Sequence, residues 1–180
     1  MFLSHIFSIL IKCSEQEQQK TGVRNAVDKK ALEQIIYGLN LDLAWEYAAA
    51  IQYTQHASML NGAEFFAIIE ELQEHANDEF GHAQILSDLI QYLGGTPTVQ
   101  VAPIGTSYSN KEMLQQDLQG EYEAIQRYLQ RIQQFESLGM YDISEQIREI
   151  AAEEQEHAND LEIALGIEKT MFGPQKLSFE

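Results

Sequence analysis

The sequence is poor in residues that several common kinds of protein depend on. It contains one cysteine, Cys13, so it forms no disulfide within the chain and no metal site with four thiolates, and a reducing compartment suits it best. Only three prolines are present, which leaves long stretches free to be helical. No segment reaches the ~18 consecutive apolar residues of a membrane-spanning helix. These absences predict a cytoplasmic helical protein with no disulfide and no membrane partner.

Basic residues are also scarce. The chain has 11 Lys and Arg against 28 Asp and Glu, which gives a formal net charge of -17. Such a charge repels nucleic acid and anionic membrane surfaces and attracts small cations, so we expect no nucleic-acid partner. The hydrophobic share of 44% in 180 residues is enough for the core of one domain.

Four stretches have the pattern of long helices. The first opens near Asp28, a plausible N-cap, and the second stops at Gly94. Ser109 and Asp142, each followed three residues later by a glutamate, open the other two as capping boxes. The predicted helices cover about residues 28–61, 63–93, 110–138 and 142–166. Residues 1–27, apolar at their start but without the basic flank of a signal peptide, form an extension of unknown role, and 167–180 form a tail.

The lengths of the connections predict the topology. The first and third connections are short, so each joins two antiparallel helices. The middle connection, about residues 94–109, is long enough when extended, at ~50 Å, to cross a bundle of thirty-residue helices ~45 Å long. The expected fold is therefore an all-α four-helix bundle with one long crossover between helices two and three.

The two halves of the chain repeat each other at an offset of 75 residues. So many identities at one offset indicate two related helical hairpins, although a chance likeness between acidic helices is the alternative. The matched pairs are Glu46 and Glu121, Tyr47 and Tyr122, Ala49 and Ala124, Tyr53 and Tyr128, Glu79 and Glu154, and His82 and His157.

The repeat contains a metal-binding pattern. Glu-x-x-His occurs twice and places a carboxylate and an imidazole on one face of a helix. Within each hairpin, the paired glutamate that lies outside this motif stands at nearly the same height along the bundle as the Glu-x-x-His of the neighbouring helix. Four glutamates buried in an apolar bundle are strongly unfavourable unless cations neutralise them. The pattern therefore predicts two metal ions per chain, bound by Glu46, Glu79, His82, Glu121, Glu154 and His157.

The chemistry of these donors favours particular metals. Four carboxylates and two imidazoles, without a thiolate, suit iron first and manganese second. Asp78 and Glu153 each precede a ligand histidine by four residues, and either orient those imidazoles or are surface charges. Tyr53 and Tyr128 either hydrogen-bond the ligands, donate electrons or simply pack in the core.

Two further histidines have less distinctive positions. His75 lies four residues before Glu79, and we expect it to be a surface histidine or a hydrogen-bonded histidine of the core rather than an outer or entry ligand. His56 is likewise expected to pack or to support a ligand.

These motifs resemble the bacterioferritin branch of the ferritin-like family over about residues 28–167. The likeness rests on Glu46, Gln52-Tyr53 and His56-Ala57 in the first helix and on the other five predicted ligands. It implies that Glu79 and Glu154 bridge the two metals, while Glu46 with His82 and Glu121 with His157 each bind one. Members of the family oxidise Fe(II) with O2 or H2O2, and many store the product as Fe(III) mineral inside a hollow protein cage.

The chain departs from that family pattern at two places. Phe80 stands where bacterioferritins place a haem-binding methionine, so we expect no haem. The tail after Gly166 is no clear fifth helix, so the resemblance implies a homo-oligomer but not the usual cage of 24 subunits. The leading interpretation is a ferroxidase for iron storage or detoxification. The alternatives are a rubrerythrin-like di-iron peroxidase or oxygenase acting on a small molecule, and a non-enzymatic metal-binding assembly protein.

Overall fold

The structure is a computed structural model of the chain that describes residues 29–167. The chain divides into two compact units, Met1–Ile35 and Ile36–Glu180. The first unit is described only over residues 29–35, where helix α2 begins, so the bundle discussed below is that of the second unit. The expected cap at Asp28, the extension 1–27 and the tail from residue 168 onward lie outside the described residues.

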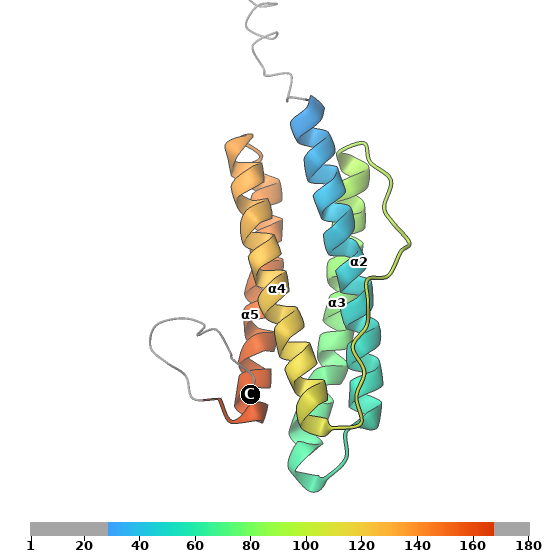
Figure 1. The fold of residues 1–180 in the computed structure, drawn as a ribbon. Helices are drawn as coiled ribbons and strands as arrows, with labels where there is room; N and C mark the ends of the chain where they lie inside the picture. Colours follow the sequence, from blue (N-terminus) through green and yellow to red (C-terminus); the bar gives the residue numbers. More distant parts are fainter. Residues whose placement is uncertain (1–28, 168–180) are drawn as a thin grey trace, which may run out of the picture. The chain divides into compact units, whose positions relative to one another are not determined.

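The described residues form four long helices and no strand, which confirms the predicted all-α class (Figure 1). A short 3-10 turn begins the second of the predicted helices. The elements are α2 (Lys29–Met59), η1 (Ala63–Phe65), α3 (Phe66–Tyr92), α4 (Asn110–Ser137) and α5 (Tyr141–Leu165). None of these helices is both long and apolar enough to cross a membrane.

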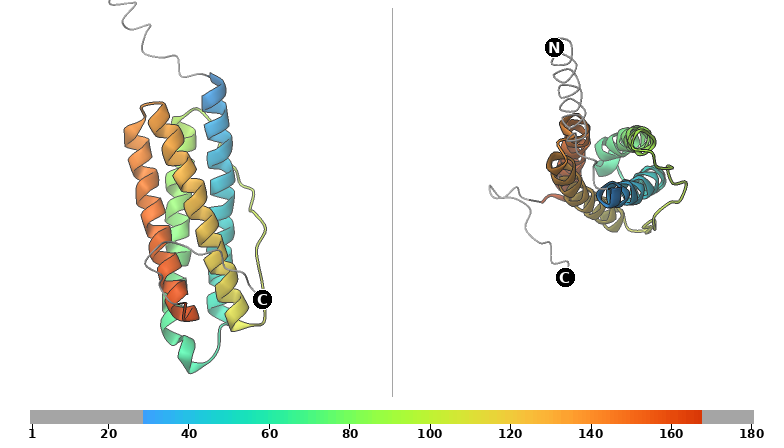
Figure 2. Two further views of the ribbon diagram at one scale, coloured as in Figure 1. Left: turned by 60° about the vertical axis from the view of Figure 1, so that its left-hand side comes forward. Right: turned by 90° about the horizontal axis from the view of Figure 1, so that it is seen from above.

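The four helices pack as two hairpins around one core. Figure 2, seen from above, shows α2 beside α3 and α4 beside α5, as the short connections predict. Leu39, Leu43 and Tyr53, which recur at helical spacing around Glu46, are almost fully buried. At one end of the bundle the core joins apolar side chains of all four helices, among them Ala57, Leu72, Leu118 and Leu161.

The long connection between α3 and α4 runs along α2, as Figure 1 shows. Its backbone is fixed to successive positions of that helix: Thr98 N donates to Asn40 Oδ1 at 2.6 Å, and Gly105 N donates to Gln52 Oε1 at 2.6 Å. Because the bonded residues advance in the same direction on both segments, the connection crosses from one end of the bundle to the other. The predicted single crossover is confirmed.

The helix ends agree with the sequence in part. Ser109 caps α4, and its Oγ accepts a hydrogen bond from Glu112 N at 3.4 Å. The Glu112 carboxylate accepts instead from Ser107, so the capping box is only half formed. The cap predicted at Asp142 is wrong: backbone bonds close the preceding turn, Met140 becomes the N-cap, and Asp142 falls in the first turn. There its carboxylate faces the positive end of the helix dipole.

Candidate metal centre

The six predicted ligands meet in the middle of the bundle, one from α2, one from α4 and two each from α3 and α5. Each side chain is at least 96% buried. They form two overlapping groups whose potential ligand atoms all lie within 4.8 Å of one another. The groups are Glu46, Glu79, His82 and Glu154, and Glu79, Glu121, Glu154 and His157.

Glu79 and Glu154 belong to both groups, and each turns one oxygen toward each histidine. Glu79 Oε2 lies 3.3 Å from His82 Nδ1, and its Oε1 lies 3.3 Å from His157 Nδ1. Glu154 Oε1 lies 3.5 Å from His82 Nδ1, and its Oε2 lies 3.4 Å from His157 Nδ1. Two carboxylates that each face both imidazoles have the arrangement that bridging two cations requires.

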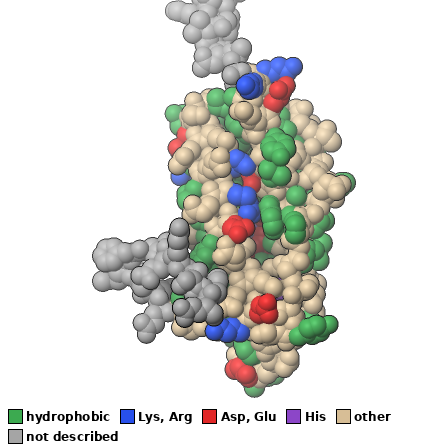
Figure 3. Space-filling view, viewed as in Figure 1, with side chains coloured by type: hydrophobic (Ala, Val, Ile, Leu, Met, Phe, Trp, Pro, Cys, Tyr) green, Lys and Arg blue, Asp and Glu red, His purple; other side chains and the backbone are tan. Residues whose placement is uncertain are grey.

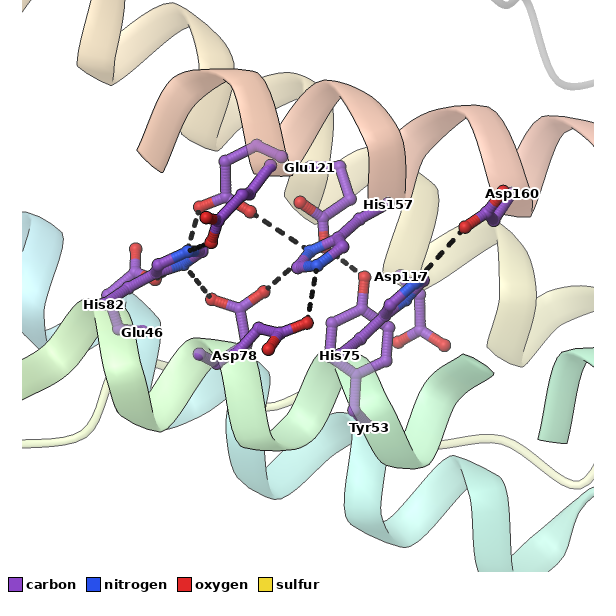
Figure 4. A network of polar contacts seen from close by, with 12 residues as sticks. Glu46, Tyr53, His75, Asp78, His82, Asp117, Glu121, His157 and Asp160 are labelled. Carbon is purple, nitrogen blue, oxygen red and sulfur yellow. Dashed lines mark hydrogen bonds and ion pairs between the residues drawn. The ribbon is translucent and has the colours of Figure 1, made fainter. Parts of the chain in front are cut away.

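Asp78 and Glu153 lie at the outer nitrogens of the two histidines, but in crossed pairs. Figure 4 shows Asp78 beside His157. Glu153 on α5 lies 2.7 Å from Nε2 of His82 on α3, and Asp78 on α3 lies 3.5 Å from Nε2 of His157 on α5. Each carboxylate therefore contacts the histidine of the other hairpin rather than the one four residues further on. A carboxylate at Nε2 favours a proton there and leaves the Nδ1 lone pair directed at the centre.

The two tyrosines also contact glutamates of the opposite hairpin. The Tyr53 hydroxyl on α2 donates to Glu121 on α4, and the Tyr128 hydroxyl on α4 donates to Glu46 on α2 at 2.5 Å. Both rings are almost fully buried. Each tyrosine thus fixes one oxygen of a glutamate that belongs to a single group.

The ionisable side chains of the centre are buried close together, away from water. Burial raises the pKa of Glu79 and Glu121 well above the usual value, and the neighbouring Glu154 charge raises both further. Burial also opposes ionisation of Glu154, but contacts with His157 and His82 outweigh it and lower its pKa to about 2. The pKa of each ligand histidine is lowered by burial but raised on balance by the surrounding carboxylates.

Several buried atoms of the cluster make no hydrogen bond. They are Glu46 Oε2, both carboxylate oxygens of Glu154, and His157 Nδ1. Buried polar atoms without partners are rare because each costs about 1–3 kcal/mol. All four atoms point into the cluster, and divalent cations would supply the missing partners. The donor set, rich in oxygen with one imidazole per group, fits iron or manganese.

Two further buried pairs of polar side chains, not predicted from the sequence, follow the same 75-residue repeat. Asp42 accepts a hydrogen bond from Arg131 Nε at 2.7 Å, and Asp117 contacts His56 Nδ1 at 2.8 Å. Asp42 and Asp117 are 75 residues apart, as are His56 and Arg131. Extending the 75-residue comparison to the positions four before Glu46 and Glu121 would have found the two aspartates. His56, expected to pack or to support a ligand, is buried against Asp117.

A pocket of about 390 Å³ leads to the centre between α2, α4 and the crossover connection. Glu46, Glu79, Glu121 and Glu154 lie in its wall, while Trp45 and Pro103 are among its apolar lining residues. It offers small molecules a route to the carboxylates. Phe80, by contrast, is 54% exposed and lies away from the centre.

A four-helix bundle with a glutamate on each of two helices and Glu-x-x-His on each of the other two is the architecture of di-iron and di-manganese carboxylate proteins. The chain belongs to the ferritin-like domain family, whose model matches residues 36–171. The resemblance to bacterioferritins is also confirmed. Bacterioferritin from Brucella melitensis is 31% identical over 139 residues, which cover 77% of this chain and 86% of that protein.

Solved structures give the same result. A ferritin-like, diiron-carboxylate protein from Bacillus anthracis is 34% identical, with a TM-score of 0.72 over 75% of this chain and 97% of that one. Bacterioferritin from Rhodobacter capsulatus shares the fold, with a TM-score of 0.69 at 24% identity over 75% of this chain and 85% of that one.

Proposed function

We propose that the protein is a ferroxidase that binds two Fe(II) ions per chain and oxidises them with O2 or H2O2, for iron storage or detoxification. The observation that carries the proposal is the pair of buried carboxylates, Glu79 and Glu154, each directed at both ligand histidines. A site for one cation would not need two such bridging groups. Manganese is the second choice of metal.

Iron is the substrate in this reaction. Two Fe(II) give up one electron each, which reduces O2 with two protons to H2O2, or H2O2 with two protons to two waters. The chain's own residues bind and hold the reactants. Glu46 and His82 hold one ion, Glu121 and His157 the other, and the bridging pair keeps both ions together, while four carboxylates balance the charge of two Fe(II). The buried surroundings limit the access of water.

Fast oxidation of two Fe(II) per chain is the test. Anaerobic metal-free protein is loaded with two Fe(II), mixed with O2 or H2O2 in a stopped-flow instrument, and followed by Fe(III) absorbance. We expect a fast phase that His157→Ala slows at least tenfold, because a ligand to one ion is lost. Glu156→Gln, an exposed neighbour on the same helix, should match the wild type. Oxidation no faster than in buffer would exclude a ferroxidase and leave a non-enzymatic metal-binding protein.

The pocket beside α2 and α4 supports a second candidate, a rubrerythrin-like peroxidase or oxygenase acting on a small molecule. Its volume and its apolar lining suit a compact organic substrate. In that case the protein would turn over peroxide or substrate repeatedly with a reductant, and would not accumulate iron. Counting iron per chain after repeated additions of Fe(II) separates the two functions.

We infer further that the protein is a cytoplasmic homo-oligomer without haem. Exposed apolar side chains on α2, namely Tyr37, Leu41 and Ile51, provide surface for contact between copies. The face in Figure 3 shows scattered acidic side chains with hydrophobic ones between them. Phe80 supplies no sulfur ligand for a haem iron.

A further inference from the structure

A third group of potential metal ligands lies outside the six-residue centre. Glu71 and His75 are one turn apart on α3, and Asp160 faces them from α5. Their ligand atoms lie within 4.8 Å of one another. Figure 4 shows His75 and Asp160 on the far side of His157 from His82.

His75 has the features of a ligand without its metal. The residue is only 3% exposed, yet no hydrogen bond to either ring nitrogen is present among the described residues. Its Nε2 lies 3.6 Å from Asp160 Oδ2, which is too long for a hydrogen bond. Two donors that bind one ion at ~2.0–2.2 Å are ~3.0–3.6 Å apart, so this separation suits a shared cation.

The surroundings hold the imidazole in place. The His75 ring stacks on the His157 ring with centroids 4.0 Å apart and planes at 27°, and the edge of Tyr53 approaches at 5.3 Å. Packing therefore orients the ring, and no hydrogen bond competes for its lone pair. Glu71 is exposed and Asp160 is half-buried, so the group opens directly to solvent.

This group also breaks the 75-residue repeat. The positions equivalent to Glu71, His75 and Asp160 in the other half are Gln146, Ile150 and Ile85, which together cannot bind a cation. The paired features of the centre follow from the repeat, whereas this group exists at one end only. Internal duplication therefore does not account for it.

We propose that Glu71, His75 and Asp160 form a third metal site that binds one divalent cation of the iron, cobalt or zinc type. Two carboxylates and one imidazole suit such ions, and water would complete the coordination. The site lies on the α3 and α5 side of the centre, beside His157. Its occupation does not depend on the redox chemistry proposed above.

Anomalous scattering from crystals of the full chain soaked in Co(II), with Co(II) titration in solution, tests the site. The wild type should show three cobalt positions per chain, one of them between His75 and Asp160. His75→Phe keeps the stacked ring but removes the lone pair, so it should lose the third position alone. Asp160→Asn, at a half-exposed residue, should weaken that position at least tenfold, while Glu74→Gln, at an exposed neighbour outside the group, should not.

Failure of this site and failure of the centre are distinguishable. Glu154→Gln damages the six-residue centre but leaves Glu71, His75 and Asp160 intact, so it should keep the third cobalt. Two cobalt positions in the wild type would overturn the third site and leave the centre standing. A third cobalt that persists in both His75→Phe and Asp160→Asn would also overturn it.

Discussion

Glu154 and Glu46 differ in how many ions they serve, although both are buried carboxylates. Glu154 faces both histidines, whereas Glu46 lies within reach of His82 alone. Glu154→Gln should therefore weaken both ions, and Glu46→Gln should weaken one and leave the ion at Glu121 and His157. Counting bound Co(II) by titration checks this, with anomalous scattering to assign the positions. Equal losses in the two variants would show that the carboxylates do not divide as bridging and terminal ligands.

At the same scale, the sequence predicts which six side chains meet at the centre, but it does not predict the contacts that support them. The ligands follow from spacing within a helix and from the repeat, both of which are local. Which histidine Asp78 or Glu153 contacts depends on the lateral register of α3 against α5, and that register is set by packing of the whole core. The helical spacing of four residues suggests the neighbour along the helix, whereas the structure pairs each carboxylate across the bundle.

Among the elements, the end of α3 depends on one backbone conformation. Gly94 has a φ of +87°, which glycine adopts freely and other residues adopt at a cost of ~1–2 kcal/mol. A Cβ at Gly94 would meet no atom within 4 Å, so Gly94→Ala should destabilise through φ alone. Gly81, inside α3 and equally open, should gain up to ~1 kcal/mol on change to Ala.

Urea unfolding of the two variants measures that contrast in one helix. The free energy of unfolding should differ by ~2 kcal/mol between Gly81→Ala and Gly94→Ala, with the wild type between them. If Gly94→Ala were as stable as the wild type, the chain would leave α3 by another backbone path.

Helix ends show what a sequence pattern can and cannot predict at this scale. The glycine after α3 predicted the end of that helix, and the length of the connection predicted the crossover, because each is a property of a single segment. The cap predicted at Asp142 was wrong because backbone hydrogen bonds close the turn before α5, so that the helix starts at Tyr141. A capping pattern identifies a helix start to within a turn, and the geometry of the preceding loop selects the residue.

On the scale of the whole molecule, the bundle is two similar hairpins that complete each other. The contacts that support the centre cross between halves: Tyr53 reaches Glu121, Tyr128 reaches Glu46, and Glu153 reaches His82. Neither hairpin contains a complete group of ligands. Metal binding and the docking of the hairpins are therefore coupled, and bound cations should stabilise the folded bundle.

This coupling should depend on pH in a definite direction. In the metal-free protein the pKa values of Glu79 and Glu121 are raised, chiefly by burial, and those of His82 and His157 are raised by the carboxylates around them. A group whose pKa is higher in the folded state stabilises the fold below its unfolded pKa, and this contribution is lost as pH rises through the folded value. For the glutamates that loss begins above the usual carboxyl range, and for the histidines above about pH 6.5. The metal-free centre therefore becomes less favourable between pH 5.5 and 8, while cations bind better because fewer protons compete.

We expect the increase in Tm on adding Co(II) to be larger at pH 8 than at pH 5.5, as measured by calorimetry at fixed free Co(II). At a hundred times the Kd the ions would contribute ~2.7 kcal/mol per site. In Glu154→Gln, which leaves the third site intact, the increase should be smaller than in the wild type at both pH values, and an increase in the wild type that did not change with pH would contradict protonated ligands in the metal-free protein.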